Sequence, residues 1–329
     1  MIPIEKFEKS KLIYVGGKGG VGKTVFATCI AMDLAKKGHK TLLASFNPVH
    51  SISSILEQDV SGGQIKDVKG VKNLSAIEVA IESTIEAYKI RMARTLKEFL
   101  KYTEIPLDPK PFIEIATMNP AFQEAASFDR MMDMVLYESK IYDRIVFDTA
   151  AVANAIRLIG LSKMYGLWLQ RIISTRQEAL SLRVQLSFRK DKMKEEIKKD
   201  PVLKEFLELN DKYEKVKQSL TDPNITNFIF ISIPTMLSIS VVKRFMEMVK
   251  AYQIPSGGII MNMLIPSDEA KNDKTGFLSS KFEEQEKNLK YVNETFGNEV
   301  IGSIPQYQTD VIGLSGLEKV LDDFEAFSK

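Results

Sequence analysis

The sequence is poor in the side chains that bind metals or form crosslinks. It has one cysteine, Cys29, and two histidines, His39 and His50, among 329 residues. A single thiol excludes an intrachain disulfide framework and a thiolate cluster, and it fits a reducing compartment. One thiol and two histidines at these positions cannot form a tetrahedral zinc site, so no zinc is expected.

Long apolar runs and an excess of one charge are also missing. No stretch of about 18 apolar residues is present, which argues against a transmembrane helix, and the first ten residues have no apolar core of a signal peptide. The formal net charge is +2, too balanced to favour nucleic acid or an anionic membrane surface. We therefore expect a cytoplasmic protein without a nucleic-acid partner.

A phosphate-binding loop is the strongest positive feature. Residues 16–24 read GGKGGVGKT, between an apolar run at 12–15 and a helical pattern at 25–37. Strand, glycine-rich turn and helix form the context in which backbone N–H groups surround phosphate oxygens. Lys23 is expected to reach the β- and γ-phosphates, and the Thr24 hydroxyl to hold Mg²⁺. The predicted nucleotide-binding residues here are Gly17, Lys18, Gly19, Gly20, Val21, Gly22, Lys23, Thr24 and Val25.

An acidic residue at the end of a second strand fits the same site. Residues 143–147 (DRIVF) predict a strand, and Asp148 follows it directly. Such a strand delivers a carboxylate beside the phosphate loop, where it can position Mg²⁺ through water. Thr24 and Asp148 are therefore the predicted magnesium residues.

The order of elements predicts an α/β fold of the P-loop NTPase class, with a mostly parallel sheet flanked by helices. Apolar strand patterns lie at 12–15, 41–45, 143–147, 227–232, 258–264 and 300–304, with a further candidate strand at 74–79. Helical patterns interrupt them at 82–138 and 158–222. We predict a nucleotide-binding domain of residues 1–81, 139–157 and 223–329, with a helical, client-binding subdomain of residues 82–138 and 158–222 inserted into it.

Nearly the whole chain resembles the tail-anchored-protein targeting ATPases and their relatives, the arsenite-pump ATPase subunits. Lys18 gives K-G-G-x-G-K-T, similar to the deviant P-loop ATPases, whose extra lysine reaches the nucleotide of a facing partner. Residues 45–51 (SFNPVHS) resemble the first switch of the family, and residues 148–158 resemble its second switch. Asn262 and Pro305 match its adenine-binding positions.

The resemblance implies ATP and Mg²⁺ as ligands, hydrolysis of ATP to ADP and phosphate, and a homodimer. Its clients are hydrophobic transmembrane segments of tail-anchored proteins. Catalytic roles fall on Lys18 and on Asn47, which occupies the first-switch aspartate position. The charged segment 189–217 is most simply a solvated face; a membrane receptor docking there is a conceivable partner without support in the sequence.

Both switches depart from the family pattern. Asn47 replaces the aspartate that polarises the attacking water, and such a carboxylate is worth about 10²–10⁴-fold in rate. ATP binding should survive while hydrolysis is slow or lost. The second switch reads Ala-Val-Ala-Asn at 151–154 where the family has Pro-Thr-Gly-His. Asn47 could be an engineered trap or natural divergence; the four adjacent changes in the second switch favour divergence.

The helical segments leave two interpretations open. Their apolar residues could line a client groove, since methionine surfaces adapt to varied partners, or they could form a packed core, which is the commoner meaning of helical periodicity. Two alternatives to a targeting factor also remain: a pseudo-ATPase that uses nucleotide to bind protein partners, and an arsenite-pump subunit, which the single thiol disfavours. The candidate groove residues are Met131, Met132, Met134, Met164 and Trp168.

Overall fold

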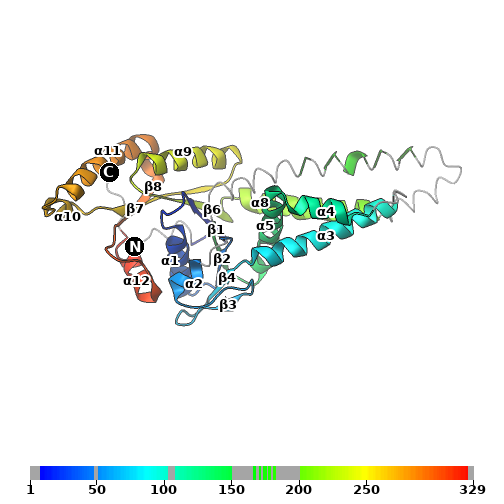
Figure 1. The fold of residues 1–329 in the computed structure, drawn as a ribbon, viewed down its shortest axis with the longest axis horizontal. Coiled ribbons are helices and arrows are strands. Elements are labelled where there is room, and N and C mark those ends of the chain that lie inside the picture. The colour runs from blue at the N-terminus through cyan, green and yellow to red at the C-terminus, as the bar shows by residue number, and fades with distance from the viewer. Residues whose placement is uncertain are drawn as a thin grey trace. The chain divides into compact units, whose positions relative to one another are not determined.

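An eight-stranded sheet carries the fold of the computed structural model (Figure 1). The structure describes residues 8–47, 51–102, 108–149 and 201–324, and residues 166–167, 170–171, 173–175, 177–178 and 181–182 between them. The strands are β1 (Leu12–Gly17), β2 (Thr41–Ser45), β3 (Lys66–Asp67), β4 (Leu74–Glu78), β5 (Arg144–Asp148), β6 (Thr226–Ser232), β7 (Ser256–Leu264) and β8 (Val300–Pro305). This confirms the predicted α/β class.

The strand order is β3-β4-β2-β5-β1-β6-β7-β8, and every neighbouring pair is parallel except β3–β4. The register sets three polar side chains in one row at the carboxyl edge. Asp148 of β5 pairs with Val15 on one side and with Ser45 of β2 on the other. Ser45 in turn pairs with Glu78 of β4. In open parallel sheets this edge, where the strand order reverses, is where ligands bind.

Three helices pack on one face of the sheet: α1 (Lys23–Lys36), α2 (Ser51–Leu56) and α12 (Gly313–Asp322). Of these three helices, α1 has the most buried residues. Its apolar side chains join those of β1, β2, β5 and β6 in one hydrophobic cluster. Because α1 is buried nearly all round, it is a core helix and not an amphipathic surface helix. As a whole, α1 packs against β1, β2 and β5.

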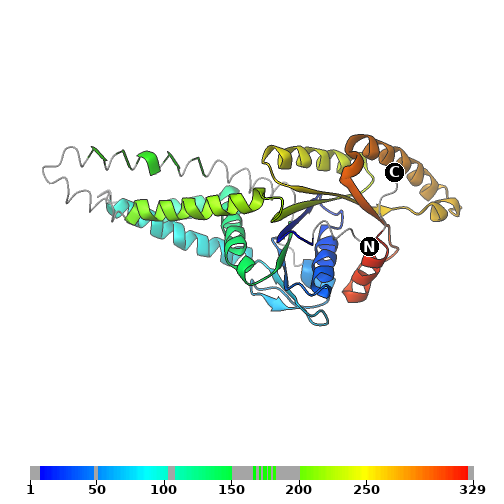
Figure 2. The same ribbon diagram turned by 180° about the vertical axis from the view of Figure 1, so that it is seen from behind.

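The opposite face of β6–β8 is covered by α9 (Met236–Ala251) and α11 (Phe277–Phe296), which run above the strands in both views (Figures 1 and 2). Gln285 of α11 pairs with the backbone of Ile265, donating to its carbonyl (3.1 Å) and accepting from its N–H (2.8 Å). Asn288 of α11 donates to the carbonyl of Pro234 just before α9 (2.9 Å). The short elements α10 (Ser267–Lys271) and η3 (Gly297–Glu299) flank α11.

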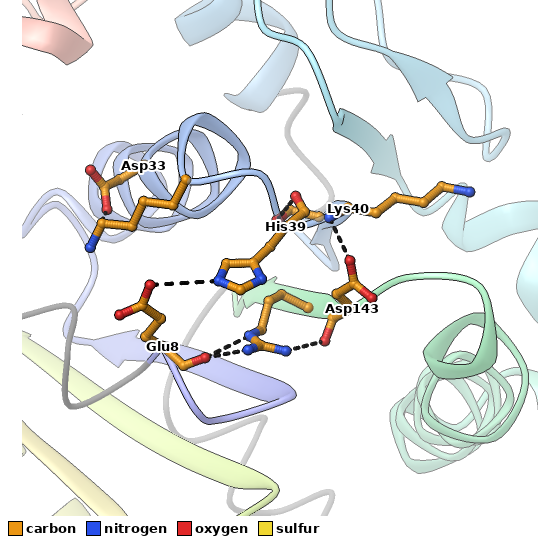
Figure 3. A network of polar contacts seen from close by, with 8 residues as sticks. Glu8, Asp33, His39, Lys40 and Asp143 are labelled. Atoms are coloured by element: carbon orange, nitrogen blue, oxygen red, sulfur yellow. Dashed lines mark hydrogen bonds and ion pairs between the residues drawn. The ribbon is translucent and has the colours of Figure 1, made fainter.

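A polar network fastens the amino end of the sheet (Figure 3). Arg144, the first residue of β5, donates from Nε to the carbonyl oxygen of Glu8 (2.9 Å), and His39 Nε2 lies 3.7 Å from Glu8 Oε1. Asp143 Oδ2 accepts the backbone N–H of Lys40 (2.9 Å). The start of β5 is therefore tied to the segments that precede β1 and β2.

The helices between the strands form a second compact unit of residues 81–136 and 157–218, and the sheet belongs to a unit of residues 1–80, 137–156 and 219–329. The second unit contains α3 (Ile81–Tyr102), α4 (Lys110–Thr117), α5 (Pro120–Leu136) and most of α8 (Pro201–Thr221). None of the described helices is long and apolar enough to cross a membrane.

Charged side chains join three of these helices. Asp129 of α5 is 4% exposed. It pairs with Arg91 of α3 and accepts from Lys212 Nζ of α8 (3.1 Å), which also donates to Asp133 (2.7 Å). A buried carboxylate is tolerated when it is paired in this way.

The methionines of α5 are core residues. Met131, Met132 and Met134 are only 4%, 2% and 0% exposed, so the expectation that they line an open groove does not hold in this conformation. Their spacing places Met131, Met134 and Val135 on one inward side of the helix. Met164 and Trp168 lie outside the described residues.

Three elements were not expected from the sequence. β3 and α2 are two and six residues long, too short for a clear period. The three prolines of residues 105–111 predict a break in the helical pattern, but α4 begins within that stretch, directly after Pro109. Proline at the start of a helix is favourable, because its missing N–H would have had no partner there.

The contact of β1 with β6 generates a test of the sheet. A Cβ at Gly17 would lie 2.4 Å from the carbonyl oxygen of Ile231, so Gly17→Ala should destabilise the fold by about 1–3 kcal/mol through overpacking. Thermal unfolding measures this. Gly19→Ala is the matched control, because a Cβ there meets nothing within 4 Å. Equal melting temperatures for the two variants would contradict the described β1–β6 contact.

Candidate nucleotide site

The phosphate loop leaves the carboxyl end of β1 and enters α1. Gly20 and Gly22 have φ of 77° and 92°, which L-residues rarely adopt, so glycine is needed at both turns. Gly22 caps α1 without a side-chain hydrogen bond, and the free backbone N–H groups of a helix start favour an anion there. Lys23 Nζ donates to the carbonyl of Lys18 (3.0 Å), which spans the loop. Burial lowers the pKa of Lys23, while the charge of Asp148 raises it.

The residues beside Lys23 fit a magnesium ion. Thr24 Oγ1 and Ser45 Oγ each donate to Asp148 Oδ2, both at 3.0 Å. Asp148 Oδ1 is buried without a hydrogen-bond partner among the described residues. An acceptor left over at this position suits a water bound to Mg²⁺, and Mg²⁺ usually keeps several waters and binds few protein groups beside phosphates. The ion, when bound there, supplies charge that stabilises the transferring phosphoryl group.

The electrostatics of Asp148 also suit a cation. Burial raises its pKa, and the neighbouring Glu78 acts in the same direction, against the hydrogen bonds from Thr24 and Ser45 and the charge of Lys23. A buried carboxylate near a second carboxylate is stabilised by a cation. In the part of the chain that the structure describes, no group of three or more His, Cys, Asp or Glu residues could hold a metal alone; nucleotide phosphates would complete this site.

Asn47 lies two residues after the end of β2 and stands at the edge of the same site. Its backbone N–H donates to Ser45 Oγ (3.1 Å), and its side-chain Nδ2 donates to Ser51 Oγ (3.2 Å) at the start of α2. The first-switch segment is therefore linked to Asp148 through Ser45. The amide of Asn47 donates where a carboxylate would accept.

A cavity of about 460 Å³ adjoins the phosphate loop. It is bounded by Gly22, Val25 and Phe26 at the start of α1, by Ser54 and Ile55 of α2, by Asn262 and Met263 of β7, and by residues 304–312. Asn262 Nδ2 donates to the carbonyl of Val21 (3.0 Å). This bond fixes the amide orientation and leaves Oδ1 as the acceptor atom. The volume and position suit a nucleobase and ribose.

The predicted nucleotide residues thus meet at one edge of the sheet. The loop residues 17–25, Asn47, Asp148, Asn262 and Pro305 come together from β1, α1, β2, β5, β7 and β8. The altered second switch at 151–154 lies outside the described residues. Sequence reasoning missed the hydroxyl of Ser45, although its place at the end of a predicted buried strand next to the first switch was a usable signal.

Comparison with known proteins decides the family. The family model described as anion-transporting ATPase matches residues 10–325, which is nearly the whole chain. The chain belongs to this family. It is an ATPase.

Relatives from distant organisms match over similar lengths. ATPase ASNA1 homolog 2 of Paramecium tetraurelia is 29% identical over 313 residues, covering 94% of this chain and 91% of that protein. ATPase GET3C of Arabidopsis thaliana is 29% identical over 271 residues, covering 79% and 68%. A putative arsenical pump-driving ATPase 2 of Aquifex aeolicus is 25% identical over 309 residues, covering 94% and 97%.

The magnesium residues can be tested by substitution. Asp148→Asn should weaken the contribution of Mg²⁺ to ATP binding about 10–100-fold, the usual cost of losing a group that orients metal ligands. Titration of a fluorescent ATP analogue, with Mg²⁺ and with EDTA, measures this contribution. Asp143→Asn, at the other end of β5, is the control and should keep it. A D148N variant that responds to Mg²⁺ like the unaltered protein would rule out the assigned role.

Proposed function

We propose that this ATPase is a cytoplasmic, homodimeric targeting factor for hydrophobic tail-anchored-type membrane segments, and that it hydrolyses ATP slowly. The targeting role is supported by the match to the ASNA1 homolog over 94% of this chain and to GET3C over 79% of it. The observation that carries the slow cycle is Asn47, which holds the position of the first-switch aspartate beside an intact phosphate loop and the Thr24–Asp148 pair. In the proposed dimer the side chain of Lys18, partly exposed at the loop, reaches the nucleotide of the partner.

The slow step follows from the chemistry of the Asn47 side chain. A carboxylate at this position can accept a proton from water or orient it, whereas an amide cannot accept a proton. In addition, the side-chain Nδ2 of Asn47 already donates a hydrogen bond to Ser51 Oγ. ATP binding depends on the phosphate loop, Thr24 and Asp148, none of which is altered. The proposed protein therefore binds ATP firmly and remains in its ATP form for long periods.

Restoring the carboxylate tests this point. Asn47→Asp should raise the single-turnover rate of ATP hydrolysis by about 10²–10⁴-fold, with an unchanged dissociation constant for MgATP. Asn47→Ala is the control, because it also removes the amide and should not accelerate the reaction. Rapid hydrolysis by the unaltered protein, at a rate that N47D does not exceed, would refute the slow cycle.

A client surface is proposed on the helical unit. Phe112, Ile115 and Met118 follow one another at three-residue spacing along α4 and its end, and they are 56%, 68% and 81% exposed. Ile90 of α3 is also exposed. Such clustered apolar exposure marks interaction surfaces in soluble proteins. This surface takes the place of the methionines of α5, which are buried.

The client surface can be separated from folding. Phe112→Ser combined with Ile115→Ser should reduce retention of a single-span tail-anchored segment at least about tenfold, since each large apolar side chain contributes about 1.5–3 kcal/mol when buried. Co-purification of that segment with MgATP present measures retention. Leu237→Ser with Phe277→Ser, two exposed apolar residues of the sheet unit, is the control. Equal retention by both pairs would remove the proposed client surface. Failure of the unaltered protein to keep the segment soluble would remove the targeting proposal.

Two other functions have weaker support. An arsenite-pump subunit would need clustered thiolates, but Cys29 is buried in α1 with Sγ 3.6 Å from the carbonyl oxygen of Leu317. Burial also raises the pKa of the Cys29 thiol, which disfavours the thiolate that binds soft ions. A pseudo-ATPase that binds partners through nucleotide alone would show no turnover, even with N47D.

A further inference from the structure

Glu78 is a buried carboxylate that has no role among the nucleotide and magnesium contacts. It ends β4 and is 1% exposed. Both of its side-chain oxygens accept hydrogen bonds from one residue of α2: Oε1 from the backbone N–H of Ser53 (3.0 Å) and Oε2 from the Ser53 hydroxyl (2.7 Å). Burying a charge is costly unless hydrogen bonds compensate it, so this double contact is a strong local constraint on α2.

Ser53 extends the constraint in both directions along the chain. Its Oγ accepts the backbone N–H of Val60 (3.1 Å), and the N–H of Glu78 donates to the carbonyl of Val60 (3.2 Å). Ser51, in the same turn of α2, accepts the hydrogen bond from Asn47. The carboxylate of Glu78 therefore holds the turn to which the first-switch side chain is attached.

The same short helix contacts the nucleobase cavity. Ser54 and Ile55, the residues after Ser53, line the 460 Å³ cavity together with Asn262 and residues 304–312. One six-residue helix thus touches the first-switch segment through Ser51 and the cavity through Ser54 and Ile55. A small rotation of α2 would change both regions together, and the contact between Glu78 and Ser53 opposes such a rotation.

We propose that Glu78 is a positioning residue for ATP hydrolysis: through Ser53 it fixes α2, so that the first-switch segment and the nucleobase cavity respond to ATP as one unit. Its place supports this, because strand pairing sets Glu78 beside Ser45, and Ser45 beside the magnesium carboxylate Asp148. The proposal rests on the ATPase activity of the family and does not depend on the client or on the rate set by Asn47.

Glu78 could instead act directly by its charge on Asp148, and substitutions distinguish the two routes. Glu78→Gln removes the charge and one acceptor. Glu78→Asp keeps the charge but shortens the side chain, so that it cannot hold both groups of Ser53. Ser53→Ala keeps the charge and removes only the hydroxyl. Asp59→Asn is the matched control, a carboxylate-to-amide change at an exposed residue of the segment between α2 and β3.

The experiment measures single-turnover hydrolysis and binding of a fluorescent ATP analogue with Mg²⁺, using the full chain. E78Q, E78D and S53A should each lower the hydrolysis rate roughly tenfold, because small misplacements of catalytic elements cost such factors, and each should keep the dissociation constant within about twofold. The E78Q/S53A double variant should be no slower than either single variant, since both remove one interaction. D59N should behave like the unaltered protein.

Several results would overturn the proposal. Independent, multiplying losses in the double variant would show that Glu78 does not act through Ser53. Full activity in E78D or S53A would assign the effect to charge alone, and an equal loss in D59N would make it nonspecific. If E78Q fails to fold, S53A decides the matter, because it removes a single hydroxyl.

Hydrogen exchange gives a second measurement that does not depend on turnover. MgATP should slow exchange of the amides of residues 51–60 in the unaltered protein and in D59N. In E78Q this protection should disappear at residues 51–60 but remain at residues 17–26 of the phosphate loop. Protection lost at both segments, or kept at both, would contradict the proposed coupling.

Discussion

The register of four parallel strands is the constraint on which the site depends. Pairing of β4 with β2, of β2 with β5 and of β5 with β1 aligns Glu78, Ser45, Asp148 and Val15 across the carboxyl edge of the sheet. A shift by one residue in any pair would turn the affected side chain to the other face. The Ser45 hydroxyl and the Asp148 carboxylate, which lie 103 residues apart in the chain, meet because that register is fixed.

Much of this arrangement was accessible from the sequence. The phosphate loop and the central strands carry strong local signals, because buried parallel strands are continuous apolar runs and the loop needs glycines at defined positions. The signal for Asp148 is weak alone, since many apolar strands end in an acidic residue, but the phosphate loop makes a carboxylate there expected. The contacts of Glu78 with Ser53 were not accessible, since a glutamate at the end of a strand has the same local pattern whether it faces solvent or is buried. The methionines of α5 illustrate the same limit: periodicity shows that one side of a helix is apolar, but it does not show what covers that side.

The two ends of β5 make different kinds of contact. At its start, Asp143 and Arg144 bind the backbone of the segments before β1 and β2, and at its end Asp148 receives Thr24 and Ser45. The strand between them is buried and lies in the centre of the sheet. The amino end of the strand is thus fixed by backbone contacts, whereas the first-switch segment reaches the Asp148 carboxylate through the Ser45 hydroxyl. Such short polar links can rearrange when a nucleotide arrives, while the sheet beneath them stays rigid.

Cys29 gives the protein a practical property. Its thiol is enclosed between α1 and α12, and its raised pKa leaves it largely protonated at neutral pH. Reagents that modify thiols should therefore find no accessible target in the native fold. A cysteine introduced on α2 or α4 would be the single reactive position, so spectroscopic probes could report on each helix without first removing a native residue.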